Sequence, residues 1–292
     1  MKVLILGAKG NLGGQLVKVF RTDDNEVTDW DKEEIDITDR ELIIKKVKDI
    51  KPDVIINAAA YNAVDKCEES AAQYEIAKKV NIDGPRFLAE AALASRAILV
   101  HYSSDYVFDG KKKRGYVETD EPNPINKYGK TKYQGEKKMI GLSGAGLKWY
   151  LIRTSKLFGP TGESKAVKPS FFDLMLKQSK GKDELEVVNQ ELSCFTYTLD
   201  LAQATSKLIA SKSGYGIYHL VNPNAYTWYG AAKEFFKVAQ INIKIKPVSA
   251  SKFPRPAKRP KYSVLLNTKF KPLRSFEEAL ADYWKELKVI KS

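Results

Sequence analysis

Cysteine and histidine are scarce in this sequence of 292 residues, which contains Cys67, Cys194, His101 and His219 and no others. Two cysteines are too few for a disulfide framework, and two histidines beside them give no credible zinc cluster. No uninterrupted apolar stretch approaches the roughly 18 residues of a transmembrane helix. We therefore expect two free thiols, no metal ligands of this kind and a cytoplasmic protein without a membrane partner.

Acidic residues are outnumbered, because 49 lysines and arginines against 36 aspartates and glutamates give a net charge of +13. Such a balance suits nucleic acid, an anionic membrane surface or a phosphorylated small molecule, and charge alone does not choose among them. The basic clusters, at 111–114 and 252–261, lie in no recognisable nucleic-acid-binding module. We therefore expect no nucleic-acid partner.

Short apolar segments alternate with helical patterns through the first half of the chain. Strands are expected at 2–6, 26–30, 54–57, 97–102 and 149–153, and helices at 11–20, 39–48, 80–94 and 128–140. Continuous apolar strands in this order are buried on both faces, which predicts an α/β protein with a doubly wound parallel Rossmann sheet. A ligand then binds at the carboxyl ends of the strands.

The pattern loosens after residue 154, which suggests a division of the chain. We expect residues 1–154 to form a dinucleotide-binding Rossmann domain onto which segment 195–221 packs back. Residues 155–194 and 222–292 are expected to form a smaller α/β substrate-binding domain. After residue 154 we expect a lid-like segment at 159–169, helices from about 170, 198 and 227 and at 276–287, and strands near 187 and 217–221.

A GxxGxxG pattern follows the first strand at once. Glycines at a strand-to-helix junction allow a tight turn, so that the helix N-terminus can meet a pyrophosphate. Asp31 ends the second strand, where a carboxylate accepts hydrogen bonds from an adenosine ribose. Asp31 favours NADH because it repels a 2′-phosphate, whereas Lys9 favours NADPH, so the preference between NADPH and NADH stays open. The predicted contacts in the turn are Gly7, Lys9, Gly10, Asn11, Leu12 and Gly13.

Two further segments are candidate cofactor contacts. Asp36 and Ile37 lie where a loop can cover the adenine, although the neighbouring Thr38 or Asp39 would serve equally as a helix cap. The third strand ends in small residues, which would let a cofactor lie across the edge of the sheet. These residues are Ala58, Ala59 and Ala60.

Tyr128 and Lys132 carry the clearest chemical signal. Four residues apart on a helix, they share one face, where the ammonium lowers the tyrosine pKa from about 10 towards the working pH. The spacing alone is equally typical of a surface helix. Ser104, at the end of the fourth strand, adds a hydroxyl for a substrate carbonyl, although alone it would merely satisfy a turn. Together the three predict proton transfer to a carbonyl while a nicotinamide supplies hydride.

With these motifs the chain resembles the extended short-chain dehydrogenase/reductases, and within them the dTDP-4-dehydrorhamnose reductase family. The resemblance covers nearly the whole length. The segments 63–66 and 259–260 are typical of that subfamily rather than of the superfamily. The carriers are 7–13, Asp31, 36–37, 57–60, 63–66, 103–108, 128–132, 135–136, 153–155, 218–220, 227–229, 259–260 and Ser263.

The resemblance implies reduction of the C4 keto group of dTDP-4-dehydro-L-rhamnose to dTDP-L-rhamnose by NADH or NADPH. It makes Tyr128 the proton donor and Lys132 the contact of the nicotinamide ribose, and Ser104 replaces the usual threonine. It also implies a homodimer, with Mg²⁺ at the dimer contact in some members, whose ligands we do not identify in this sequence. The resemblance places Ala60, Tyr61 and Asn62 in the cofactor groove and Val64, Ser104, Asp105, Tyr106 and Lys156 on the sugar nucleotide.

Three departures from the family lie on the expected substrate side. Lys156 stands where the family has a tryptophan, so a flexible cation replaces an aromatic surface. Segment 190–195 lacks the usual glycine and proline, and segment 159–170 is rich in lysine. Two alternatives therefore stay open. One is a non-catalytic, NADP-binding regulatory subunit resembling the methionine adenosyltransferase β-subunit, and the other is a sugar-nucleotide epimerase or dehydratase.

Overall fold

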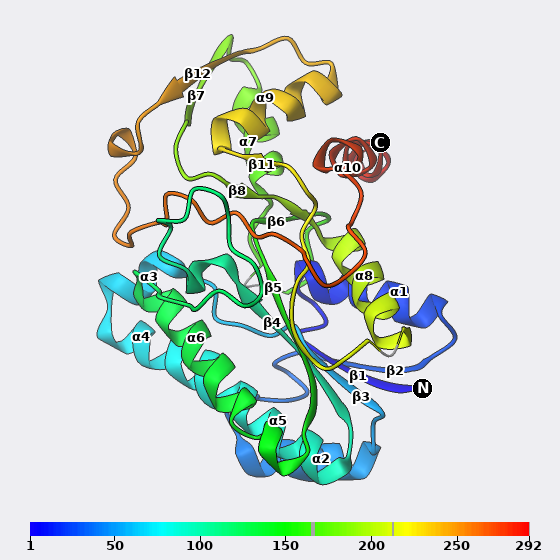
Figure 1. Ribbon diagram of the computed structural model, residues 1–292. Coiled ribbons are helices and arrows are strands. Elements are labelled where there is room, and N and C mark those ends of the chain that lie inside the picture. Colours follow the sequence, from blue (N-terminus) through cyan, green and yellow to red (C-terminus); the bar gives the residue numbers. More distant parts are fainter. Residues whose placement is uncertain (165–166, 212, 292) are drawn as a thin grey trace.

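The computed structural model describes residues 1–164, 167–211 and 213–291, with backbone alone for 289–291. Within these ranges six strands form one parallel sheet in the order β10-β5-β4-β3-β1-β2 (Figure 1). The strands are β1 (Lys2–Leu6), β2 (Glu26–Trp30), β3 (Val54–Asn57), β4 (Ile98–Ser104), β5 (Lys148–Thr154) and β10 (Gly216–His219).

The register of the sheet places the candidate residues at one edge. Leu6 pairs with Asn57, which pairs with His101, so β1 and β3 end side by side. β4 and β5 continue together as far as the pair Ser104 and Thr154. The strand order reverses between β1 and β3, and a crevice forms at such a switch point.

Helices cover both faces of the sheet. One face carries α1 (Asn11–Thr22) and α8 (Thr198–Ala210), and the other carries α2 (Arg40–Ile50), α5 (Gly84–Ser95) and α6 (Lys127–Ile140) (Figure 1). The first interface buries Leu16 and Leu208 against the sheet, and the second buries Ile43 and Leu88. The prediction of a doubly wound α/β sheet is confirmed.

The prediction of one continuous helix at 80–94 is wrong at its start. Residues Lys79–Asp83 form a π-helical turn, η1, and α5 begins at Gly84. Two helices before it were also not expected, α3 (Val64–Glu69) and α4 (Ala71–Lys78). Ser70 separates them, and its side chain caps α4 by accepting a hydrogen bond from the Gln73 N–H. Each helix is too short to show a helical repeat of apolar residues in the sequence.

The rest of the chain packs around an aromatic cluster that includes Phe158, Phe172, Phe195, Phe235 and Phe276. Its helices are α7 (Phe171–Ser179), α9 (Trp228–Ala239) and α10 (Phe276–Lys291), and single-turn 3₁₀ helices occur at Asp105–Val107, Ser143–Ala145 and Ala250–Lys252. Paired short strands are β6 (Leu157–Phe158) with β9 (Thr196–Tyr197), β7 (Glu184–Val188) with β12 (Lys244–Val248), and β8 (Ser193–Cys194) with β11 (Ala225–Tyr226).

The division into a 1–154 unit and a substrate-binding unit stays a prediction. In segment 195–221, α8 packs against α1, and β10 pairs with β5 as an edge strand of the main sheet. Cys67 and Cys194 are free, as expected, and both are buried. No helix in the described ranges is long and apolar enough to cross a membrane.

A buried ion pair fixes α6 to the sheet. The guanidinium of Arg153, on β5, donates to both carboxylate oxygens of Glu136, on α6, at 3.1 and 2.7 Å. The two side chains are only 2% and 1% exposed. A charge left here without its partner would be strongly destabilising.

Glu136→Gln should therefore lower the free energy of unfolding by about 3 kcal/mol, because it leaves the buried guanidinium without a counter-charge. Glu90→Gln is the control, since Glu90 pairs with the half-exposed Arg40 and should cost less than about 1 kcal/mol. Urea denaturation of the three proteins measures both effects. Equal losses in the two variants would contradict the importance of burial at Glu136.

Candidate active site

The glycine turn and the end of β3 pack directly against each other at the switch point. Gly7 has a φ of +74°, and a Cβ built on it would lie 2.7 Å from the Ala59 backbone nitrogen. A Cβ on Gly13 would lie 2.0 Å from the Gly7 carbonyl oxygen. Both positions therefore require glycine, and the close approach of backbone to backbone places the start of α1 at the crevice.

The N-terminus of α1 suits a phosphate group. Gly10 is the N-cap residue and has no side chain, so no side-chain cap bonds to the first N–H groups of the helix. Uncapped N–H groups and the positive end of the helix dipole attract an anion. The Leu12 side chain points into the core instead, so only its backbone is suited to a phosphate contact.

Asp31 and Lys9 have partners of their own at this edge. The Asp31 carboxylate accepts hydrogen bonds from the backbone N–H groups of Lys9 (2.9 Å) and Lys32 (2.8 Å). The Lys9 ammonium donates to Glu33 at 3.1 Å, and this hydrogen bond raises its pKa. Lys9 is thus a cation among carboxylates, and a 2′-phosphate would have to compete with Glu33 for it.

A segment from the second half of the chain reaches the glycine turn. The side chain of Asn11 donates to the Lys168 carbonyl (3.2 Å) and accepts from the Gly162 N–H (2.8 Å). A Cβ on Gly162 would lie 2.3 Å from the Lys9 carbonyl oxygen. The described part of the expected lid therefore lies on the turn, while its residues 165 and 166 lie outside the described residues.

The remaining predicted cofactor residues differ in their surroundings. Ala58 is half-buried, Ala60 and Asn62 are exposed near the end of β3, and Asp36 accepts hydrogen bonds from Thr38. Ile37 is 6% exposed and belongs to the core, where it touches the start of α5. Ile37 can therefore contact a bound adenine only through the small part of its side chain that is exposed.

Asn81, in the π-helical turn, is a positioning residue that was not anticipated from the sequence. Its side chain accepts from the Tyr61 N–H and donates to the Tyr61 carbonyl, both at 2.9 Å. It also donates to the Thr131 hydroxyl at 3.0 Å. One buried amide thus joins the predicted cofactor groove at Tyr61 to α6, the helix of Tyr128.

Ser104 and Tyr128 meet beyond the end of β4. The Ser104 hydroxyl donates to Asp105 (3.1 Å), accepts from the Tyr106 N–H (3.1 Å) and forms a hydrogen bond with Tyr128. Asn126 caps α6 by accepting from the Gly129 N–H at 2.7 Å, which sets where the helix begins. The rings of Tyr106 and Tyr128 meet edge to face, with centroids 6.0 Å apart.

Lys132 lies one helical turn further along α6 and is 2% exposed. Its ammonium donates to the carbonyl oxygen of Tyr102, on β4, at 2.7 Å. An ammonium has three N–H donors, so this bond leaves two of them for a bound ligand. Burial lowers the pKa of Lys132 to about 8, an effect that the nearby Glu136 opposes.

The expectation that Lys132 lowers the pKa of Tyr128 is wrong for this structure. Burial raises the pKa of Tyr128 above its ordinary value, and the Asp105 charge adds to this, while the bond with Ser104 acts in the opposite direction. The ammonium is directed to Tyr102 rather than to the phenol. Tyr128 is therefore a firmly protonated phenol, the form that a proton donor needs.

Lys156 is held by its neighbours rather than free. Its backbone has a φ of +36°, and its ammonium donates to the Glu191 carbonyl at 2.9 Å. The ammonium lies 4.0 Å from the centre of the Trp228 ring. Burial lowers the pKa of Lys156 to about 7, against the opposing charge of Asp105. The aromatic surface of this region thus comes from Trp228, with Lys156 resting on it.

The segments 63–66 and 259–260, which are typical of the subfamily, meet at an ion pair. Arg259 donates to both carboxylate oxygens of Asp65, at 2.7 Å for one of the pairs, and the Ala257 N–H also donates to Asp65. Val64, beside Asp65, is half-buried at the start of α3. Ser263 donates to Asp105 at 2.6 Å. The C-terminal segment is thereby attached next to the predicted substrate residues.

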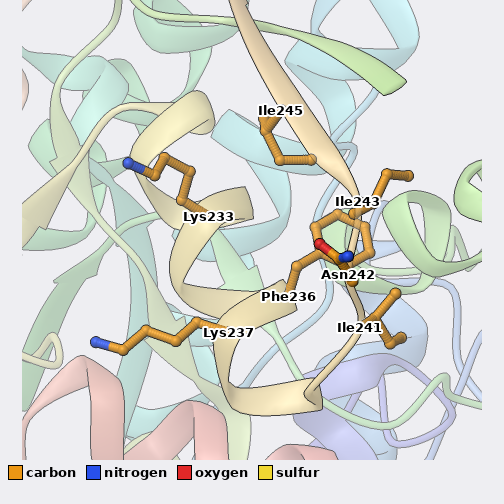
Figure 2. Close-up of a pocket in the computed structure, with 7 residues that line it drawn as sticks. All are labelled: Lys233, Phe236, Lys237, Ile241, Asn242, Ile243 and Ile245. Atoms are coloured by element: carbon orange, nitrogen blue, oxygen red, sulfur yellow. The ribbon is translucent and has the colours of Figure 1, made fainter. Parts of the chain in front are cut away.

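Two cavities are lined mainly by residues of the second half of the chain. The smaller, of about 160 Å³, lies between α9 and β12 and is lined by Phe236, Ile243 and Ile245 among others (Figure 2). None of its lining residues belongs to the edge of the main sheet. The larger, of about 510 Å³, includes Glu191, Arg255 and Arg259 in its wall. Arg259 links the wall of the larger cavity to the site, because its side chain forms a hydrogen bond with Tyr106.

Comparison with known proteins identifies the family. Residues 1–289 match the family model described as the RmlD substrate binding domain. A dTDP-4-dehydrorhamnose reductase of Aggregatibacter actinomycetemcomitans is 35% identical, covering 100% of this chain and 98% of that protein. The chain belongs to the dTDP-4-dehydrorhamnose reductase family. The resemblance inferred from the motifs is confirmed.

Solved structures agree with membership of the dTDP-4-dehydrorhamnose reductase family. The enzyme from Clostridium acetobutylicum has a TM-score of 0.90 at 40% identity, covering 99% of this chain and 100% of that one. The enzyme from Bacillus anthracis, in complex with NADP, has a TM-score of 0.90 at 34% identity, covering 98% and 99%. A UDP-glucose 4-epimerase of Thermotoga maritima, at 18% identity and a TM-score of 0.84, shares the fold alone.

The Mg²⁺ that the resemblance implied has no ligand set here. Among the described residues, no three histidine, cysteine, aspartate or glutamate side chains gather so as to hold a metal ion. The acidic residues of the site are already bonded within the chain, as with Asp65 and Asp105. The described residues of the single chain thus supply no Mg²⁺ site, and the ion at a dimer contact stays a prediction of the resemblance.

The buried Lys132 gives a pH-dependent prediction. Between its folded pKa of about 8 and its ordinary value of 10.5, the unfolded chain holds a proton that the folded chain lacks. Stability therefore rises with pH across this window, and below it the buried charge is destabilising. Lys132→Met should raise the free energy of unfolding most below pH 8, and the gain should shrink by about 3 kcal/mol towards pH 10.5.

Chemical denaturation of the wild type and the Lys132→Met variant across this pH range measures the difference between them. Taking the difference cancels the other titrating groups, which both proteins share. Two stability profiles that run parallel through the window would show that Lys132 titrates normally.

Proposed function

We propose that the chain is a cytoplasmic NAD(P)H-dependent reductase that converts dTDP-4-dehydro-L-rhamnose to dTDP-L-rhamnose by reducing the C4 keto group. The observation that carries this is the hydrogen bond between Ser104 and Tyr128, with the buried Lys132 one helical turn from Tyr128, at the edge of the sheet that the glycine turn also reaches. The names of the full-length relatives support the choice of substrate, and the homologue in complex with NADP supports the cofactor.

The residues divide the chemistry between them. A substrate carbonyl accepts hydrogen bonds from the Ser104 hydroxyl and the Tyr128 phenol, which polarise it and then deliver the proton. NAD(P)H, when bound, supplies the hydride. Gly7, Gly10 and Gly13 let the backbone approach its pyrophosphate, and the free donors of Lys132 bind its ribose. No step uses a metal ion.

The preference between NADH and NADPH follows from the carboxylates of Asp31 and Glu33 beside the glycine turn. Asp31 is fixed by two backbone N–H groups, and Lys9 is paired with Glu33. A ribose hydroxyl can donate to the Asp31 carboxylate, whereas a 2′-phosphate meets negative charge from Asp31 and Glu33. We infer that NADH is bound more tightly than NADPH, with Lys9 keeping NADPH usable.

The assay of choice follows the oxidation of NADH and NADPH with dTDP-4-dehydrorhamnose and related keto sugar nucleotides. The purified chain should turn over, and Tyr128→Phe should lower kcat at least about a hundredfold because the proton donor is lost. Tyr133→Phe is the matched control, since Tyr133 lies on the same helix and packs against the cluster of Val107 and Phe108.

The outcomes separate the alternatives. Cofactor binding without turnover of any keto sugar, together with recovery of a partner synthetase, would favour a regulatory subunit. Tightly held NAD⁺ that survives purification would favour an epimerase or dehydratase. Full activity of the Tyr128→Phe variant would remove the phenol from the mechanism while leaving the reductase itself standing.

Adjacent glycines test the dinucleotide site. Gly13→Ala places a Cβ 2.0 Å from the Gly7 carbonyl oxygen, whereas Gly14→Ala meets nothing closer than 3.9 Å. We expect Gly13→Ala to raise the Kd for NADH and NADPH at least about tenfold by opening the turn, and Gly14→Ala to leave both unchanged. Fluorescence titration measures the Kd values, and circular dichroism confirms that both variants fold. Equal affinities in the two variants would place the cofactor elsewhere.

A further inference from the structure

Lys156 carries a charge to which the proposed reaction gives no role. Its ammonium donates to the Glu191 carbonyl at 2.9 Å. It also lies 4.0 Å from the ring centre of Trp228 and 4.8 Å from that of Phe195, and these two rings meet edge to face. Two aromatic side chains and a carbonyl oxygen are suited to holding a cation. The ammonium is therefore bound within the chain although no carboxylate touches it.

The backbone at both ends of this hydrogen bond is unusual. Lys156 has a φ of +36° and Glu191 a φ of +65°, so two non-glycine residues in the left-handed region are bonded to each other. Such conformations cost free energy and persist only where the surroundings hold them. The Glu191 carboxylate is itself fixed, because it accepts from the Trp228 indole N–H at 3.0 Å and pairs with Arg255. The position of the ammonium is thus set from several sides.

Asp105 is the buried carboxylate beside this cation. It is 2% exposed, and it accepts hydrogen bonds from the hydroxyls of Ser263 at 2.6 Å and Ser104 at 3.1 Å. In the described part of the chain it forms no salt bridge. Because Ser104 pairs with Thr154 in the sheet, Asp105 and Lys156 follow the ends of neighbouring strands. Burial raises the pKa of Asp105, and the charge of Lys156 opposes this rise.

The other charges around Lys156 largely cancel. Burial lowers the pKa of Lys156 to about 7, and Asp105 is the first of the charges that oppose this effect. Glu191 and Arg255 also face the ammonium, but they form an ion pair with each other. Burial raises the pKa of the Cys194 thiol, which faces both Lys156 and Asp105, to about 12, so it stays neutral. Asp105 is therefore the carboxylate whose charge Lys156 is free to offset.

The charge of Asp105 reaches the proton donor. Burial raises the pKa of Tyr128, and the charge of Asp105 raises it further, as it does for the neighbouring Tyr106. When Tyr128 gives its proton to the substrate carbonyl oxygen, the electron pair of the broken O–H bond stays on the phenolate. The negative charge of Asp105 opposes that new charge, and a cation beside Asp105 weakens the opposition.

We propose that Lys156 is a positioning residue for the reduction, whose ammonium, held by Trp228 and the Glu191 carbonyl, offsets the charge of Asp105 and so helps Tyr128 to release its proton. The proposal rests on the proposed function for the reaction at Tyr128, but the pairing of Lys156 with Asp105 can be measured without turnover. In this role Lys156 acts on kcat, whereas a contact with the sugar would act on KM.

The first test removes the charge and keeps the length of the side chain. Lys156→Met should lower kcat for the keto sugar nucleotide about tenfold below pH 7 and leave KM little changed, because proton release and not sugar binding is impaired. Lys156→Arg restores a cation that stacks on Trp228 and should recover most of the lost kcat. Lys271→Met is the control, since Lys271 is exposed and its removal takes away the same charge. Circular dichroism verifies that each variant folds.

The second test compares the pH dependence of kcat in the same proteins. Only the charged form of Lys156 offsets Asp105, so the wild-type kcat should fall as the pH rises through about 7. A guanidinium stays charged, so Lys156→Arg should lack this decrease, and Lys156→Met should be low on both sides of it. Lys132 titrates in every variant and cancels in the comparison. The same decrease in all three proteins would assign it to another group and overturn the role of Lys156.

The third test measures the pairing without substrate. Nuclear magnetic resonance of isotope-labelled lysine side chains follows the titration of Lys156 in the intact chain, and Lys156→Met identifies its signal. In Asp105→Asn the proton affinity of Lys156 should fall at least about threefold, because the carboxylate no longer attracts the ammonium. Asp29→Asn is the control, since Asp29 lies on the edge strand β2 and pairs with Arg21.

The outcomes distinguish this proposal from the proposed function. An unchanged proton affinity of Lys156 in Asp105→Asn overturns the pairing, even if the chain reduces keto sugars. A fall that is absent from Asp29→Asn upholds the pairing, even if no keto sugar is reduced. In an active reductase, a Lys156→Met kcat within about twofold of the wild-type value overturns the effect on Tyr128, and so does a raised KM with unchanged kcat.

Discussion

The attachment of α6 to the sheet is the constraint on which the rest of the site depends. Tyr128 and Lys132 lie on this helix, whereas Ser104 ends β4 and Asp105 follows it, so the chemistry requires the helix and the strand to keep one spacing. The Glu136 and Arg153 pair sets that spacing from within the core, and Lys132 adds a bond to the Tyr102 carbonyl. Close backbone contact of Gly135 with the Asn81 carbonyl leaves no room for any other residue. The geometry is held by buried charges, which tolerate little displacement.

The sequence allowed the parts of the fold that local pattern determines to be predicted. Strands β1, β2 and β3 occur within the predicted bounds. β1 and β3 are almost continuous apolar runs followed by a turn, whereas β2, at the edge of the sheet, mixes two acidic residues with Val27, Thr28 and Trp30. The glycine turn was predictable because a close backbone approach admits few other residues. The helices α3 and α4 were missed, since each is too short to show a period. The π-helical turn at Asn81 has no known sequence signature that would have revealed it.

What sequence patterns could not reveal is which distant residues meet. Asp65 and Arg259, 194 residues apart, belong to motifs that could be recognised singly, but nothing local indicates that they pair. The pKa of Tyr128 was misjudged for a similar reason. Helical spacing brings Lys132 to the same face, yet it says nothing of the Tyr102 carbonyl that receives the ammonium or of the burial that keeps the phenol protonated. Likewise Lys156 was recognised as a departure, while its position on Trp228 depends on the fold of residues 190–191.

The edge strand β10 has a consequence for the synthesis of the chain. β5 ends at Thr154, but its partner begins only at Gly216, after the intervening strands and helices of the second half. At roughly 5–20 residues per second, the ribosome takes on the order of several seconds to supply that partner. Throughout this interval β5 presents an unpaired hydrogen-bonding edge, and the α1 face of the sheet lacks its cover from α8. The nascent chain is therefore most exposed to aggregation, and most dependent on chaperones, after its chemical residues have been made and before its sheet is complete.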